Sequence, residues 1–279
     1  KGWIGMTWPK QYGGQERSFL ERYVVTEEFR VANAPVRLHF VADRQSGPVL
    51  LKYGSERIKA DVVPRICRGE VCFAIGMSEP NSGSDLGALE TRAVKEGEYW
   101  VVNGQTVWTS LAHIADWMML LARTDSALPK HKGITYFLLD MHSPGVTVKP
   151  LRQMTGDAEF NEVYFDNVRI HESQVLGGVN NGWAVGMTTL MYERLALGFG
   201  FQARLRITLD SLIAMAREVE KTGRTITGDP GFRQKLAQLW MDTESLRLTG
   251  ARAVTKLLRG ELPGPEASAG KMMWVETHQ

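Results

Sequence analysis

Short runs rich in β-branched and aromatic residues fill the middle of the sequence, between Val71 and His171. The runs are TRAVKEG, YWVV, TVWTS, WMMLLART, ITYFLLDM, VTVKPL and EVYFDNVRI. Each run predicts a β-strand, and no periodic segment of helical length separates them. We therefore expect an antiparallel sheet, a barrel or sandwich, over residues 71–181 rather than alternating strands and helices. Asn103-Gly104 predicts a hairpin turn between YWVV and QTVWT.

Helical patterns flank this middle region on both sides. Apolar residues recur at helical spacing between Glu16 and Ala34, and Ser55 is a suitable N-cap for a further helix. After Gly182, a segment without proline predicts one or two long helices, and Asp229-Pro230 provides a cap and a first-turn proline for another. The sequence thus predicts a helical domain over 1–70 and a helical bundle over 182–279.

The composition is that of a globular protein without an obvious charged face. The net charge of the 279 residues is +2 at pH 7, and lysine and arginine are evenly spread, so we expect no nucleic-acid partner. No apolar run reaches the ~20 residues that span a bilayer, so no membrane span is expected. Cys67 and Cys72 have no ligand-like neighbours, and the six histidines lack metal spacing, which predicts a cytoplasmic protein without a metal site. The ends of the chain suggest a piece of something longer.

The stretch FAIGMSEPNSGSDLG, from Phe73 to Gly87, offers the features of an anion-binding loop. It matches neither GxGxxG nor GxxxxGK[ST], which excludes the two commonest phosphate loops. Gly83 would let a ligand approach the backbone, and Ser84 adds a hydroxyl. Taken alone, the same residues would also suit an ordinary turn.

A second candidate segment follows at Trp108, Thr109 and Ser110. An indole can cover one face of a planar ring system, and hydroxyls or backbone amides can bond ring nitrogens and oxygens. By residue type alone, a buried tryptophan that ends a strand is an equally good interpretation.

Several stretches together resemble the acyl-CoA dehydrogenase family, in its order and spacing. They are WPKQYGG, MSEPNSGSD, VNGQTVWTS, ADWMMLLARTD, GITYFLLDM, NEVYFDNVRI and MYERLALG. The resemblance implies an N-terminal helical domain, a middle antiparallel β-barrel and a C-terminal helical bundle. It also implies bound FAD and α,β-dehydrogenation of acyl-CoA thioesters in fatty acid metabolism and lipid degradation. Electrons would pass to an electron-transfer flavoprotein, and the assembly would be a homo- or hetero-tetramer.

The resemblance assigns roles to the two candidate segments. Met77 and Ser78 would lie along the flavin ring, and Gly83 and Ser84 beside the phosphates of FAD or of the acyl-CoA. The segment from Trp108 to Ser110 would lie against the outer face of the flavin.

Two departures from the family pattern stand out. Asn81 replaces a common glycine, which asparagine tolerates because it accepts a left-handed backbone. The Arg-x-x-Phe-Gly that reaches the FAD of a neighbouring subunit in many members is absent, and only Arg224 or Arg233 could replace it.

Glu193 is the candidate catalytic base. It and Arg194 are the only charged residues from Trp183 to Gln202, and apolar helical neighbours surround Glu193. Removing the α-proton of a thioester needs a carboxylate. One branch of the resembling family has its base at this position, whereas the other branch has it in a later segment, which would lie beyond Gln279. Arg194 is expected to bind the substrate.

Two other functions remain open. The same fold could serve an acyl-CoA oxidase or a flavin monooxygenase, in which reduced flavin meets oxygen. Alternatively, the chain could be a non-catalytic subunit of a heteromeric acyl-CoA dehydrogenase, because the arginine motif is absent and the base could lie elsewhere.

Overall fold

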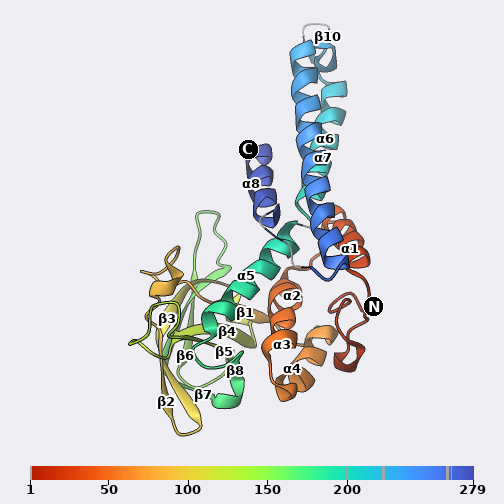
Figure 1. Ribbon diagram of the computed structural model, residues 1–279. Helices are drawn as coiled ribbons and strands as arrows, with labels where there is room; N and C mark the ends of the chain where they lie inside the picture. Colours follow the sequence, from red (N-terminus) through yellow and green to blue (C-terminus); the bar gives the residue numbers. More distant parts are fainter. Residues whose placement is uncertain (1, 199, 222–223, 262–263, 265) are drawn as a thin grey trace. The chain divides into compact units, whose positions relative to one another are not determined.

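The chain forms two compact units in a computed structural model that describes residues 2–198, 200–221, 224–261, 264 and 266–279 (Figure 1). The first unit comprises residues 1–16 and 36–192, and the second comprises residues 17–35 and 193–279. The two clusters of buried hydrophobic residues found among the described residues lie in the first unit, and the second unit buries side chains such as Leu205, Leu209 and Leu246. The division into domains at residues 70 and 181 stays a prediction.

The longest helix of the first unit that precedes the sheet, α4 (Glu56–Arg68), begins where a local sequence signal predicts it. Ser55 caps α4, because its hydroxyl accepts a hydrogen bond from the Ile58 amide at 3.3 Å. Pro64 lies inside this helix, which continues to Arg68, so the proline does not end it. Before α4, the short helices α2 (Arg37–Val41) and α3 (Gly47–Tyr53) flank a π-helical turn, and the sequence did not predict them.

Eight strands form one sheet in the first unit, coloured yellow to green in Figure 1. The pairing order is β6-β7-β3-β2-β4-β5-β8, and β1 pairs with β4. Most pairs are antiparallel, as predicted, but β1 runs parallel to β4 and β2 meets β4 in a short parallel contact. The strands are β1 (Phe73–Gly76), β2 (Arg92–Glu96), β3 (Tyr99–Ser110), β4 (Trp117–Arg123), β5 (Ile134–Asp140), β6 (Val146–Leu151), β7 (Phe160–His171) and β8 (Val175–Leu176).

Two details of the predicted sheet are wrong. The sheet is open rather than closed into a barrel, since β6 and β8 end the path of pairing among the described strands. Asn103-Gly104 is not a hairpin turn, because β3 passes through both residues and continues its pairing with β7. The turn lies instead between Glu96 and Tyr99, where Gly97 has a φ of +59°.

The central strands β4 and β5 are buried on both faces, which explains their continuous apolar runs. Met119, Leu121 and Tyr136 face a core formed with α3, α4 and the start of α5 (Gly182–Gly198). Met118 and Leu120, on the opposite face, pack against side chains of β3 and β7. The sheet therefore folds back on itself over one core and supports helices over the other.

The second unit is helical. It contains α1 (Phe19–Val31), the end of α5, α6 (Phe201–Glu218), α7 (Pro230–Leu258) and α8 (Glu266–His278). The side chain of Asp229 accepts from the Phe232 amide at 2.8 Å, which confirms the predicted start of α7 at Pro230. Between α1 and α6, the amide of Gln202 donates to the hydroxyl of Tyr23 at 2.9 Å. None of the helices described is both long and apolar enough to cross a membrane.

Candidate functional site

The loop that follows β1 is fixed at its first turn by a buried carboxylate. The Glu79 side chain, 8% exposed, accepts hydrogen bonds from the backbone amides of Glu90 and Thr91, each at 2.7 Å. Glu79 also forms a two-way backbone bridge with Ser82, at 3.0 and 3.1 Å. A carboxylate that receives two amide protons is a strong anchor, so this turn has a defined position.

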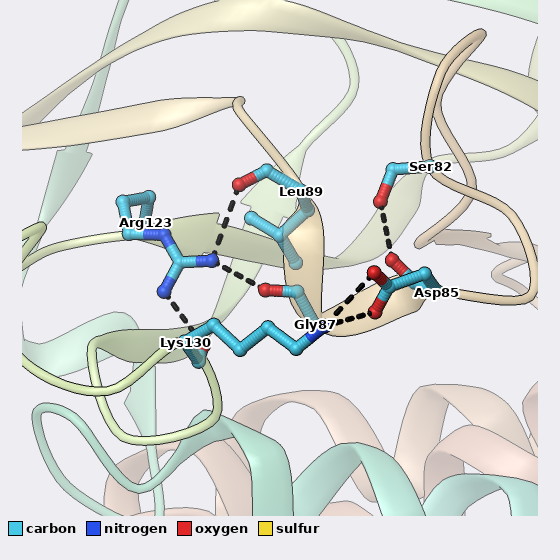
Figure 2. A network of polar contacts seen from close by, with 6 residues as sticks. All are labelled: Ser82, Asp85, Gly87, Leu89, Arg123 and Lys130. Carbon is cyan, nitrogen blue, oxygen red and sulfur yellow. Dashed lines mark hydrogen bonds and ion pairs between the residues drawn. The ribbon is translucent and has the colours of Figure 1, made fainter.

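The far end of the same loop is held by two cationic side chains, Arg123 and Lys130. Figure 2 shows the guanidinium of Arg123 between backbone carbonyls, with Nη2 donating to Gly87 at 2.7 Å and to Leu89 at 3.3 Å. The ammonium of Lys130 contacts both carboxylate oxygens of Asp85, at 2.7 and 2.8 Å. The loop from Glu79 to Leu89 is thus secured at both ends.

The tip between these anchors is open. Gly83 and Ser84 are exposed, and a methyl group added at Gly83 would meet no atom within 4 Å. The backbone there is accessible to a ligand, as an anion-binding segment requires. Met77 and Ser78, at the start of the loop, are buried and half-buried respectively.

Trp108 occupies a conformation that bulky residues rarely adopt. Its φ is +59°, and it lies in a β-bulge of β3 between Thr106 and Thr109, where the register with β7 shifts. The indole is 61% exposed, so the prediction of a buried strand tryptophan is excluded. Strained residues of this kind persist where the surrounding structure holds them, and they cluster at functional sites.

A buried asparagine holds the bulge in place. Asn161, 0% exposed, donates from its side-chain amide to the carbonyls of Thr109 at 2.9 Å and Glu159 at 3.1 Å. Its side-chain oxygen lies 3.1 Å from Nδ1 of His113. Thr109 is itself 1% exposed, and its hydroxyl bonds that of Thr106 at 3.0 Å, whereas Ser110 is exposed.

One backbone hydrogen bond joins the two candidate segments. The amide of Val107 donates to the carbonyl of Ser78 at 2.8 Å. Trp108 is the next residue after Val107, so the exposed indole and the start of the loop are neighbours. The structure therefore brings together two segments that the sequence separates by some thirty positions.

Glu193 and Arg194 belong to the second unit. Glu193 is half-buried on α5 and Arg194 is exposed, whereas the following Leu195 is buried. Burial raises the pKa of the Glu193 carboxyl above its ordinary value of 4.5, and the positive charges of Lys271 and Arg194 partly oppose that rise. A carboxylate of this kind can accept a proton near neutral pH more readily than an exposed glutamate.

Three residues that anchor the site escape prediction from the sequence: Glu79, Arg123 and Asn161. Each bonds backbone carbonyls or amides of other segments, and no local pattern predicts such bonds. All three residues lie in stretches that resemble the family, which is the signal that could have found them. Of the two arginines considered as substitutes for the missing motif, Arg233 is exposed at the start of α7. The Arg224 side chain is outside the described part of the structure.

The cysteines and metal-ligand residues suggest no further site. Cys67 and Cys72 are both free and half-buried, and burial raises the pKa of the Cys67 thiol to about 11. Among the described residues, no three histidine, cysteine or acidic side chains gather as a metal site would need. The cytoplasmic location and the absence of a metal stay predictions.

The sequence matches three family models, each described as a part of acyl-CoA dehydrogenase. The N-terminal domain matches residues 1–70, the middle domain matches 74–168, and the C-terminal domain matches 180–279. Acyl-CoA dehydrogenase IpdE1 of Mycobacterium tuberculosis is 34% identical over 278 residues, which cover 98% of this chain and 69% of that protein.

Two solved structures agree with this chain in fold and sequence. A structure entitled "Tcur3481-Tcur3483 steroid ACAD" has a TM-score of 0.89 and 36% identity, covering 99% of this chain and 70% of that chain. The crystal structure of the ChsE4-ChsE5 complex from Mycobacterium tuberculosis has a TM-score of 0.88 and 32% identity, with coverages of 99% and 70%. The fold, the ordered sequence motifs and these matches agree: the chain belongs to the acyl-CoA dehydrogenase family, a family of oxidoreductases.

Proposed function

We propose that this chain is part of an FAD-dependent dehydrogenase that converts an acyl-CoA thioester to its enoyl-CoA. The observation that carries the proposal is the exposed Trp108, which is held in a strained conformation next to the Ser78 segment. An exposed indole is costly to leave in water, and a planar ring stacked on it would cover it.

The residues of the first unit fit FAD in shape and chemistry. Trp108 offers an aromatic face, and Gly83 offers an accessible backbone at which a phosphate could approach. Further contacts with FAD would come from Met77, Ser78, Ser84 and Ser110. Ser84 would also contact the acyl-CoA. Thr109 is too buried to expose its side chain, so we assign it a contact through its backbone or through support of the bulge.

We assign the proton transfer to Glu193. Its carboxylate would take the α-proton of the thioester, while the flavin, when bound, accepts the β-hydride. The pKa of Glu193 is raised by burial, which is the direction that favours a base working near neutral pH. Arg194, exposed beside it, would bind the anionic part of the substrate.

The partners follow from the same family membership. We propose that electrons pass to an electron-transfer flavoprotein and that the chain assembles as a homo- or hetero-tetramer. The two similar structures are each named for a pair of proteins, Tcur3481-Tcur3483 and ChsE4-ChsE5, which favours a heteromer. For the same reason, a non-catalytic subunit of such an assembly is the second candidate function. An acyl-CoA oxidase or flavin monooxygenase is the third.

The experiment is an anaerobic titration of the purified protein, with any partner subunit it requires, against a panel of acyl-CoA thioesters. A steroid side-chain thioester enters the panel first, since one similar structure is named a steroid enzyme. We expect the flavin absorbance to bleach with one thioester class and to recover slowly in air. Fast recovery in air would favour an oxidase, and a protein that binds no flavin would contradict the proposal.

A further inference from the structure

The tip of the Glu79–Leu89 loop, Gly83 and Ser84, is positioned by the residues on either side of it in the chain. Gly83 and Ser84 lie between Ser82 and Asp85, and both neighbours are anchored. Ser82 is 1% exposed and is bridged to Glu79, and its hydroxyl donates to the Asp85 carbonyl at 2.8 Å. The tip has no packing of its own at Gly83. Whatever holds Asp85 therefore determines where the tip lies.

Asp85 is held by a second loop, residues 124–133, which joins β4 to β5. Lys130 of that loop pairs with the Asp85 carboxylate through its side chain and accepts a bond from Arg123 through its backbone carbonyl, at 2.7 Å (Figure 2). The two loops also pack tightly elsewhere, because a methyl group at Gly87 would lie 2.6 Å from the His131 ring.

Arg123 connects both loops with one planar group. Its guanidinium donates to Lys130 of one loop, and to Gly87 and Leu89 of the other. Its own backbone amide donates to the Thr91 carbonyl at 2.7 Å, which fixes the base of the side chain. Within the described part of the chain, no carboxylate pairs with Arg123, so its charge is available to attract an anion nearby. A lysine could not span the same carbonyls, since it lacks the rigid fork of donors.

We propose that Arg123 is a positioning residue that sets the Gly83-Ser84 tip for a phosphate-bearing ligand. The inference rests on the proposed function, which supplies two such ligands, the FAD pyrophosphate and the CoA phosphates. The ion pair of Lys130 and Asp85 holds the same tip from the solvent side. Their ion pair is half-exposed, so it contributes less than the Arg123 fork.

The test compares Arg123→Lys with Arg92→Lys. Arg92 is the matched control, because its backbone lies opposite that of Arg123 in the parallel β2–β4 contact. The Arg92 side chain is exposed and forms no hydrogen bond or ion pair among the described residues. Lys130→Met is a second variant that changes only the exposed pair. Hydrogen exchange of the peptide covering residues 78–91 is measured on each protein without added ligand. We expect faster exchange in Arg123→Lys, an intermediate rate in Lys130→Met and the parental rate in Arg92→Lys.

Ligand affinity is then measured with FAD and with an acyl-CoA thioester as separate probes. We expect the dissociation constant of at least one probe to rise about 10-fold or more in Arg123→Lys, since the loss of one hydrogen bond to a charged phosphate corresponds to roughly that change in affinity. The thioester KM should change more than kcat. The probe that loses affinity identifies which phosphate the tip serves.

Two outcomes would overturn the inference: exchange in Arg123→Lys equal to that in Arg92→Lys, or faster exchange with both affinities unchanged. A parental protein that binds neither probe would contradict the proposed function itself and, with it, the ligand assigned to the tip. That outcome is distinct from the other two, because it is seen before any variant is made.

Discussion

The amide of Val107 lies 2.8 Å from the carbonyl of Ser78, and this hydrogen bond connects β3 to the loop after β1. It sets Trp108, the next residue, beside the loop whose tip is Gly83 and Ser84. Two segments with separate and ambiguous sequence signals thereby become neighbours at Ser78 and Val107, one with an exposed aromatic group and the other with an accessible backbone at its tip.

Glu193→Gln should abolish flavin reduction by the thioester while thioester binding survives. Glutamine keeps the shape of the side chain but cannot accept the α-proton, and loss of a general base costs at least about 100-fold. Anaerobic stopped flow follows the bleaching of the flavin. Glu218→Gln, on an exposed face of α6, is the control and should react at the parental rate. If Glu193→Gln bleaches equally fast, another residue is the base.

The same substitution should change how stability depends on pH. The folded-state pKa of Glu193 is raised, so the folded protein holds this proton more tightly than the unfolded chain does. Its favourable contribution is therefore complete below about pH 4.5, near the unfolded value, and is lost as the pH rises through the folded-state pKa. Glu193→Gln should melt at a higher temperature than the parent near pH 7.5 and at a similar temperature near pH 4. Calorimetry at both values checks this, and equal melting temperatures at pH 7.5 would contradict it.

Glu79→Gln should loosen the loop. A glutamine keeps one acceptor for the two amides but turns a donor toward the other, which costs about 1–3 kcal/mol for a buried group. Urea unfolding measures the loss, and flavin affinity should fall with it. Glu90→Gln is the matched control, because the Glu90 side chain is exposed and only its backbone amide contacts Glu79. Equal losses in both variants would show that the carboxylate is not an anchor.

Asn161→Ala should release the bulge that presents Trp108. It leaves the buried Thr109 carbonyl without the side-chain donor of Asn161, whereas the Glu159 carbonyl keeps its bond from the Leu111 amide, so a loss of about 1–3 kcal/mol is expected. Asn103→Ala serves as the control, since Asn103 is exposed and its side chain bonds Asn167 on the surface of the same strand pair. Denaturant unfolding compares the two. A loss at position 161 no larger than at 103 would mean that the bulge is held by other contacts.

Gly104→Ala should be more damaging than Gly97→Ala. At Gly104, where φ is +148°, a Cβ would lie 2.5 Å from the Thr91 hydroxyl oxygen and 2.7 Å from its Cα. Strain and overpacking together should cost at least about 3 kcal/mol. At Gly97 a Cβ would meet no atom within 4 Å, so the alanine variant loses stability only through its left-handed backbone, by about 1–2 kcal/mol. Thermal unfolding of the two variants gives the comparison, and equal costs would contradict the close approach of Thr91.

Elements whose signals are local could be predicted from the sequence. The caps at Ser55 and Asp229 are examples, because each cap and the amide it bonds lie within three residues of one another. The apolar runs of β4 and β5 were also decisive, since strands buried on both faces can only be apolar. The resemblance to the family predicted the order of the three regions and assigned roles to the two candidate segments.

Tertiary structure decided the rest, because the forces involved act between residues far apart in the chain. Asn103-Gly104 carries a strong local turn signal, yet pairing along β7 overrides it, and Gly104 is needed because Thr91 approaches its backbone. Trp108 is exposed in a bulge of β3, where Asn161 of the neighbouring strand bonds the Thr109 carbonyl. The sequence by itself thus indicated two candidate ligand-binding segments, whereas hydrogen bonds from Val107, Asn161 and Arg123 decided how those segments are presented.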